Sequence, residues 1–208
     1  AGRDTGVRIP AVQAADTLLN LAGAFQAIRG NRWRTSELDD TDELLAGAGL
    51  NPTEPAGATW SPVDVPPVGW IPQDDGRITL GAAVPLGVLQ ARTAEFVAAI
   101  TAPVVVTPWR SLLICDLEEG IADTSLRVLA PMGLIFDEHS PWLSISSCTG
   151  SPGCAKSLTD VRSDAAAAAE SGEPGGRRHF VGCERACGSP AVGEVLVATN
   201  SGYEPRHP

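Results

Sequence analysis

Four of the five cysteines in this 208-residue chain fall in two close pairs. Cys148 and Cys154 are separated by a Thr-Gly-Ser-Pro-Gly segment, and Cys183 and Cys187 by Glu-Arg-Ala. Thiolates are soft ligands that favour iron–sulfur clusters, zinc or copper(I), and a four-iron, four-sulfur (4Fe-4S) cluster takes four of them. Glycine and proline permit a tight loop whose N–H groups can point at cluster sulfurs. The pattern predicts a metal site, and an iron–sulfur cluster is the leading interpretation.

Other interpretations of the cysteines stay open. Structural zinc sites usually have two to four residues between the cysteines of each pair, and the five-residue gap of the first pair fits that spacing poorly. A disulfide framework is typical of small secreted chains, and the sequence shows no sign of secretion. A structural domain without a metal is the remaining alternative. Cys115 lies in an apolar run and is predicted to be a buried small hydrophobic residue.

The composition favours a cytoplasmic protein that binds neither nucleic acid nor membranes. The net charge of −10 argues against affinity for polyanions and anionic lipid surfaces. The first ten residues do not resemble a signal peptide, and no apolar run approaches the roughly 18 residues of a membrane span. The chain begins at Ala1 and its single methionine is Met132, so we interpret it as a fragment or a processed product.

The negative charge lies outside the cysteine region. Residues 148–187 contain five basic and five acidic residues, whereas the rest of the chain contains 10 basic and 20 acidic residues. A neutral region in an acidic protein leaves room for an anionic ligand. Nearly all the basic residues are arginines, whose planar guanidinium binds carboxylates with two hydrogen bonds; a genomic bias toward arginine would produce the same composition.

Hydrophobic periodicity divides the chain into helical and mixed parts. Residues 10–29 and 37–50 are predicted to be helices. Residues 51–72 contain six prolines and are predicted to be a linker and domain boundary. Strands at 77–80, 104–106, 111–117 and 142–147 alternate with helices at 85–100 and 122–130. This order predicts a ferredoxin-like split β-α-β arrangement over residues 73–146.

The cysteine region follows as a second set of elements. A helix over 155–169 is expected to begin directly after Cys154 and to direct its positive dipole end at the cysteine loop. Residues 171–176 are predicted to be a loop, 179–182 a strand leading into Cys183, and 195–199 a closing strand. Residues 202–208 are predicted to be a tail.

At a finer level, the sequence resembles a known family. C-x₅-C followed by C-x₃-C resembles the nitrite and sulfite reductases that hold a 4Fe-4S cluster beside sirohaem. Three sequence segments are similar to precorrin-3B synthase of aerobic cobalamin biosynthesis. They run from Cys148 to Lys156, from Thr159 to Ala165 and from His179 to Cys187. Thr107-Pro-Trp-Arg-Ser111 and Val84-Pro-Leu-Gly87 are also similar to that family. The resemblance covers roughly residues 11–203.

The resemblance implies an α+β fold in which a ferredoxin-like split β-α-β half-domain is followed by a nitrite/sulfite reductase-type 4Fe-4S domain. Residues 1–50 would be a helical segment from the end of a first half, and residues 147–208 the domain that binds the cluster and a tetrapyrrole. Cys148, Cys154, Cys183 and Cys187 carry over as cluster ligands. In the sirohaem relatives, the cysteine that matches Cys187 bridges the cluster to the macrocycle iron.

The implied activity is the oxygen-dependent hydroxylation of precorrin-3A, with lactone formation. This oxidoreductase (monooxygenase) would need an electron donor and a further non-haem iron whose ligands the sequence does not identify. Six residues are candidates for binding the tetrapyrrole: Arg110, Lys156, Arg162, Arg178, His179 and Arg185. Arg110 could hold a carboxylate and His179 could transfer a proton. A surface salt bridge for Arg110, an ordinary strand histidine and solvated surface for the other bases are the competing interpretations.

Two departures from the family pattern leave other functions open. Family members are longer and have two related halves, and this chain keeps only the second. Ala186 stands where a second glycine is usual, so the loop is slightly crowded and full activity is an open question. The alternatives are a sirohaem-dependent sulfite or nitrite reductase-like protein and a non-catalytic 4Fe-4S electron-transfer module.

Overall fold

The computed structural model describes residues 4–57, 65–172, 176–190 and 192–206. The chain divides into two compact units, residues 1–63 and 64–208. Of the predicted linker at 51–72, residues 58–64 lie outside the described residues, as do 173–175 of the predicted loop at 171–176. Among the described residues, no helix is both long and apolar enough to cross a membrane.

The first unit is a pair of helices. A 3-10 turn at Ala11–Gln13 leads into α1 at Ala14–Ile28, and a second 3-10 turn at Thr35–Glu37 precedes α2 at Thr41–Gly47. The two helices contact each other, with Leu44 of α2 buried. The Asp40 carboxylate caps α2 by accepting a hydrogen bond from the Asp42 N–H. Both predicted helices are therefore confirmed, each shorter than expected.

The second unit begins with an antiparallel sheet in the order β1-β2-β4-β3. Its strands are β1 at Gly69–Pro72, β2 at Ile78–Ala83, β3 at Val104–Val106 and β4 at Ser111–Leu117. All neighbouring pairs run antiparallel. Strand β1 falls within the predicted linker. Proline and glycine favour turns, but Pro72 ends an edge strand, where its missing N–H is tolerated.

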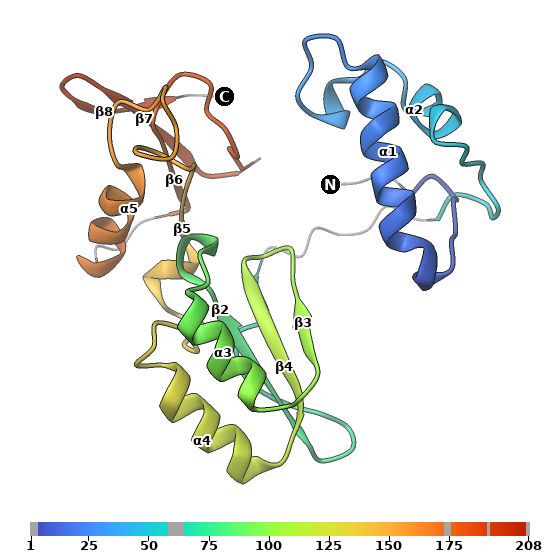
Figure 1. Ribbon diagram of the computed structural model, residues 1–208. Helices are drawn as coiled ribbons and strands as arrows, with labels where there is room; N and C mark the ends of the chain where they lie inside the picture. The colour runs from blue at the N-terminus through green and yellow to red at the C-terminus, as the bar shows by residue number, and fades with distance from the viewer. Residues whose placement is uncertain (1–3, 58–64, 173–175, 191, 207–208) are drawn as a thin grey trace. The chain divides into compact units, whose positions relative to one another are not determined.

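Two helices cover one side of this sheet, α3 at Ala91–Ala99 and α4 at Glu119–Leu129 (Figure 1). Leu80 and Ile114, which face each other across β2 and β4, are fully buried beneath them with Leu129. Alternation puts Cys115 on the other side of β4, where it is half-buried rather than fully buried as predicted.

The order β2-α3-β3-β4-α4 confirms the ferredoxin-like prediction, but the last strand is reduced to one antiparallel bridge between Ala83 and Ile135. The predicted strand at 142–147 is wrong for this sheet. Residues Pro141–Leu143 form a 3-10 turn, and only Ile145–Ser147 forms a strand, β5, in a second sheet. The predicted helix at 85–100 is also interrupted, because Leu86 has a positive φ of 51° that an α-helix does not allow.

The second sheet has the order β5-β6-β7-β8. It contains β6 at Arg178–Val181, β7 at Glu194–Thr199 and β8 at Gly202–Arg206, and helix α5 spans Val161–Glu170. Strands β5, β6 and β7 are parallel, and β8 pairs antiparallel with β7. The prediction of a tail at 202–208 is wrong for 202–206. Pro205 lies within β8, which is an edge strand, where proline is tolerated.

The two faces of this sheet are covered by different elements. Helix α5 packs against Phe180 and Ile145 through Val161, Ala165 and Ala169. On the other face, Ala186 packs against Val181 and Val195. Parallel strands need a crossover connection of about a dozen residues, which is usually a helix. Between β6 and β7 the crossover is segment 182–193, which contains Cys183 and Cys187 and whose described residues form no helix or strand.

Helix α5 begins six residues later than predicted, at Val161. The Asp160 carboxylate accepts hydrogen bonds from the N–H groups of Arg162 and Ser163, so it occupies the positive end of the helix. The expectation that this helix begins directly after Cys154 is therefore wrong. Residues 155–160 instead form turns. The first residue of α5, Val161, nevertheless lies beside Gly150 of the first cysteine loop, and the direction of the dipole toward that loop stays a prediction.

Tyr203 connects β8 to α5. Its hydroxyl donates to Asp164 Oδ2 at 2.6 Å, and its ring packs edge-on against Phe180 with 5.2 Å between ring centroids. Burial and the Asp164 carboxylate raise the pKa of Tyr203.

We expect Tyr203→Phe to lower the free energy of unfolding by about 2 kcal/mol, because it removes a hydrogen bond to a charged group and keeps the ring packing. Chemical denaturation measures this change. Thr159→Val, which removes the longer 3.2 Å bond to the same carboxylate, should cost less. Equal losses for the two variants would contradict this ranking.

Candidate metal centre

Parallel pairing brings the two cysteine pairs to one edge of the second sheet. Ser147, the last residue of β5, is in register with Phe180 of β6. Cys148 directly follows β5, and Cys183 follows β6 after one glycine. Because β5 and β6 point the same way, their carboxyl ends meet, and the first cysteine of each pair leaves the sheet at the same edge.

Backbone contacts hold the two loops together at this edge. The Cys148 N–H donates to the Phe180 carbonyl at 2.9 Å, and the Leu158 N–H donates to the Gly182 carbonyl at 2.9 Å. The Gly182 N–H in turn lies 3.4 Å from Cys148 Sγ and donates to it. An N–H directed at a cysteine sulfur stabilises a thiolate and is one means of setting a cluster's potential.

Gly182 lies in close contact with Ser157, which follows the first cysteine loop. A Cβ added there would overlap the Ser157 Oγ and lie 2.7 Å from the Ser157 Cβ. Only a residue without a side chain fits at this position.

Each cysteine loop also has an internal turn. In the first, the Cys154 N–H donates to the Gly150 carbonyl at 2.8 Å. Gly150 has a φ of +68°, and a Cβ there would lie 2.7 Å from the Val161 side chain. In the second, the Ala186 N–H donates to the Cys183 carbonyl at 3.1 Å. Ala186 has a φ of +49° and is buried, so an alanine occupies a conformation that favours glycine.

The donor chemistry of this edge fits a thiolate-held group. All four cysteines are free thiols, with Cys187 exposed and the others half-buried. Within the described parts of the chain, however, no three His, Cys, Asp or Glu side chains converge as metal ligands. The two loops are adjacent through their backbones, but binding a cluster would require their thiols to turn toward a common point.

His179 lies beneath the second cysteine loop and is only 3% exposed. Its Nδ1 is 2.8 Å from the Ser146 Oγ, and its Nε2 is 2.9 Å from the Cys187 carbonyl oxygen. Burial lowers the pKa of His179, the bond to the Cys187 carbonyl opposes this shift, and the Arg110 charge adds to it.

Arg110 connects the two sheets of the second unit. Its Nη1 donates to the Ile145 carbonyl at 2.9 Å. Burial, and to a smaller degree the charge of Arg177, lower the pKa of Arg110. Part of its donor capacity is therefore used inside the protein, and the binding of a carboxylate by Arg110 stays a prediction.

A groove of about 880 Å³ extends from Cys183 along strands β7 and β8. Two of the predicted substrate-binding bases, Lys156 and Arg185, line it together. Arg206 lines it as well and donates from Nη1 to the Glu184 carbonyl at 2.9 Å. Two predicted substrate-binding bases, Lys156 and Arg185, thus line the same groove as the predicted cluster ligand Cys183.

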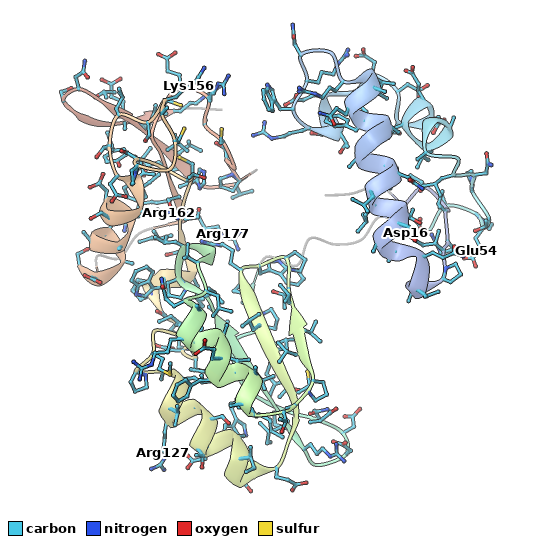
Figure 2. The ribbon with its side chains drawn as sticks, viewed as in Figure 1. Asp16, Glu54, Arg127, Lys156, Arg162 and Arg177 are labelled. Carbon is cyan, nitrogen blue, oxygen red and sulfur yellow. The ribbon has the colours of Figure 1, made fainter. Side chains whose placement is uncertain are left out.

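The other two predicted bases lie elsewhere in the second unit. Arg162 lines a separate, mainly apolar cavity of about 430 Å³ beside Leu86 and Met132, and Figure 2 shows it well apart from Lys156. Arg178 lines a third cavity, of about 510 Å³, next to Arg177. Its buried Nε has no hydrogen-bond partner within the described residues. The six predicted substrate residues thus do not form one site in this structure.

Three residues that contribute to this region are absent from the sequence prediction. Ser146 contacts His179 only because β5 and β6 pair, and 33 positions separate the two residues. Gly182 carries a weak signal, since a glycine at the end of a strand indicates a close approach. Arg206 lies in the segment 202–208 that was predicted to be a tail.

Comparisons with known proteins define the fold. No protein-family model matches the chain, and no curated protein matches its sequence. Among solved structures, the chain is similar to the NirA protein of Mycobacterium tuberculosis, with a TM-score of 0.66 and 16% sequence identity. The likeness covers 97% of this chain and 43% of the NirA chain.

At this identity the likeness shows the fold alone. The chain has a mixed α+β fold with a ferredoxin-like sheet, as predicted, and it shares this fold with NirA. It spans less than half the length of the NirA chain.

We expect Gly182→Ala to lower the free energy of unfolding by about 1–3 kcal/mol, because the new methyl group forces the two cysteine loops apart. Gly120→Ala is the matched control. Nothing lies within 4 Å of a Cβ at Gly120, which is within α4, so alanine should stabilise the protein there by about 0.5–1 kcal/mol. Thermal unfolding of both variants measures the difference, and equal stabilities would contradict the close contact.

Proposed function

We propose that this chain is the cluster-bearing part of an iron–sulfur oxidoreductase of the nitrite/sulfite reductase type. The observation that carries the proposal is the position of Cys148 and Cys183 at the carboxyl ends of paired parallel strands, with the Gly182 N–H directed at Cys148 Sγ. The likeness of the fold to NirA supports it. Cys148, Cys154, Cys183 and Cys187 would hold a 4Fe-4S cluster, which supplies one-electron transfer when bound.

The protein's own groups would serve such a cluster in three ways. The Gly182 N–H would stabilise negative charge on the Cys148 sulfur. The Cys183–Ala186 turn would direct two thiols from one short loop. The groove beside Cys183 would hold an anionic tetrapyrrole, with Lys156 and Arg185 binding its carboxylates through charge-assisted hydrogen bonds.

The cluster is tested by anaerobic purification, followed by iron and sulfide analysis and electron paramagnetic resonance (EPR) of the reduced protein. We expect about four irons and four sulfides per chain. Cys183→Ser should abolish or strongly change the reduced signal, whereas Cys115→Ser, a change outside the four-cysteine set, should leave it intact. Zinc in place of iron, or no metal after anaerobic reconstitution, would overturn the proposal.

Three finer functions compete within this proposal. A sirohaem-dependent reductase of sulfite or nitrite is favoured by the likeness of the fold. Precorrin-3B synthase is favoured by the sequence around the cysteines, including residues 159–165 and 179–187. The second function would add a non-haem iron, oxygen and precorrin-3A. An electron-transfer module without its own substrate is the third candidate.

The substrate separates these candidates. The cluster-loaded chain is titrated with sirohaem and with precorrin-3A, and binding is followed by absorption. Reduction of sulfite or nitrite with bound sirohaem would support the reductase, and oxygen-dependent conversion of precorrin-3A would support the synthase. A loaded cluster that exchanges electrons but binds neither tetrapyrrole would favour the module.

We expect Lys156→Gln and Arg185→Gln each to weaken tetrapyrrole binding about tenfold or more, because each removes a charge-assisted hydrogen bond in the groove. Arg162→Gln is the matched control, since Arg162 lines a different cavity. Binding titrations of the three variants measure the ranking. A larger loss for Arg162→Gln than for the other two would place the ligand in the other cavity.

A further inference from the structure

The segment 182–193 crosses one face of the second sheet, and His179 is the polar side chain buried beneath it. His179 and Ser146 are neighbours in the parallel register of β5 and β6, so both side chains project toward this face. The imidazole connects strand β5 to the segment that crosses above it. One nitrogen contacts the Ser146 hydroxyl at 2.8 Å, and the other contacts the Cys187 carbonyl at 2.9 Å.

The partners determine which ring nitrogen carries the proton. A carbonyl oxygen can only accept, so Nε2 must donate to Cys187. In a neutral ring Nδ1 then has a lone pair, and the Ser146 hydroxyl donates to it. The Cys187 carbonyl thus selects the tautomer, and the Ser146 hydroxyl holds the other ring nitrogen in place. A histidine oriented by a second polar group is the usual arrangement where its other nitrogen has a defined task.

Other contacts hold the neighbouring residues of the loop. Glu184 is held through its carbonyl by Arg206, and Ala186 is held by packing and by its bond to Cys183. Gly188, with a φ of +79°, passes over the ring, and a Cβ there would lie 3.5 Å from the imidazole. The bond from His179 therefore links the sheet to the second cysteine of this pair.

We propose that His179, oriented by Ser146, is a positioning residue that fixes the main chain at Cys187 and with it the direction of the Cys187 thiol. This role rests on the proposed function, in which Cys187 is a cluster ligand. Both ring nitrogens are engaged within the protein, so the histidine acts through Cys187 and not through contact with a substrate.

The positioning is tested first in the metal-free protein, independently of any cluster. Hydrogen exchange of the loop amides, including Ala186 and Ser189, reports how often the loop opens. His179→Phe removes the donor, and we expect these amides to exchange roughly three- to tenfold faster. His179→Gln keeps an N–H donor and should restore part of the protection. The matched control is His139→Phe, because the His139 side chain is 87% exposed.

Ser146→Ala is the milder second variant, since it removes only the hydroxyl that orients the ring. It should raise exchange of the same amides by about two- to threefold. If His179→Phe does not fold, this variant decides the question. Exchange unchanged from the His139→Phe control in every variant that folds would overturn the proposal.

The cluster-loaded protein gives the second measurement. We expect His179→Phe to keep its iron but to show an altered EPR line shape and a shifted midpoint potential, with His179→Gln closer to the native protein. A purely structural role would lower stability and leave both signals unchanged. A native chain that binds no cluster would overturn the proposed function, and the exchange of the metal-free loop would still decide whether His179 holds Cys187.

Discussion

Three paired residues of β5 and β6 are the constraint on which the candidate site depends. Ile145, Ser146 and Ser147 pair in parallel with Arg178, His179 and Phe180. This short register brings two cysteine loops that are distant in sequence to one edge of the sheet, and it also sets Ser146 beside His179. A slip by one residue would turn His179 to the face covered by α5. The burial of Phe180 and Val161 in the core under α5 opposes that slip.

The sequence predicts the parts of this arrangement that have local signals. The cysteine pairs, the Pro-Gly loop and the alternating strands each have a pattern of their own, and the ferredoxin-like order follows from periodicity. The start of α5 was missed because the prediction extended the helix from the alanine run at 165–169 back to Ala155, whereas Asp160 provides the N-cap. Leu158 and Ser157 are then used in contacts with Gly182, a distant partner that periodicity does not identify.

For the candidate site, the sequence predicted residue types but not which side chains lie together. Residue type alone suggested six substrate-binding side chains, and the structure brings only Lys156 and Arg185 to the groove beside Cys183. Arg110 and His179 instead bind backbone carbonyls, of Ile145 and Cys187. A buried donor must find an acceptor, and in a short strand the nearest acceptors are main-chain oxygens. Which carbonyl lies within reach is a property of the tertiary fold, and the local sequence does not determine it.

The crossover between β6 and β7 has a consequence for the order of assembly. A helix in this position could form early from local contacts, but the described residues of this segment, 182–190 and 192–193, form no helix or strand. It becomes ordered only when β7 has found its place beside β6, a pairing that closes a chain loop. We expect the second pair of thiols to be fixed late in folding, after the helix α5 side of the sheet. Iron delivered to the newly made chain would meet these ligands before they are held in place.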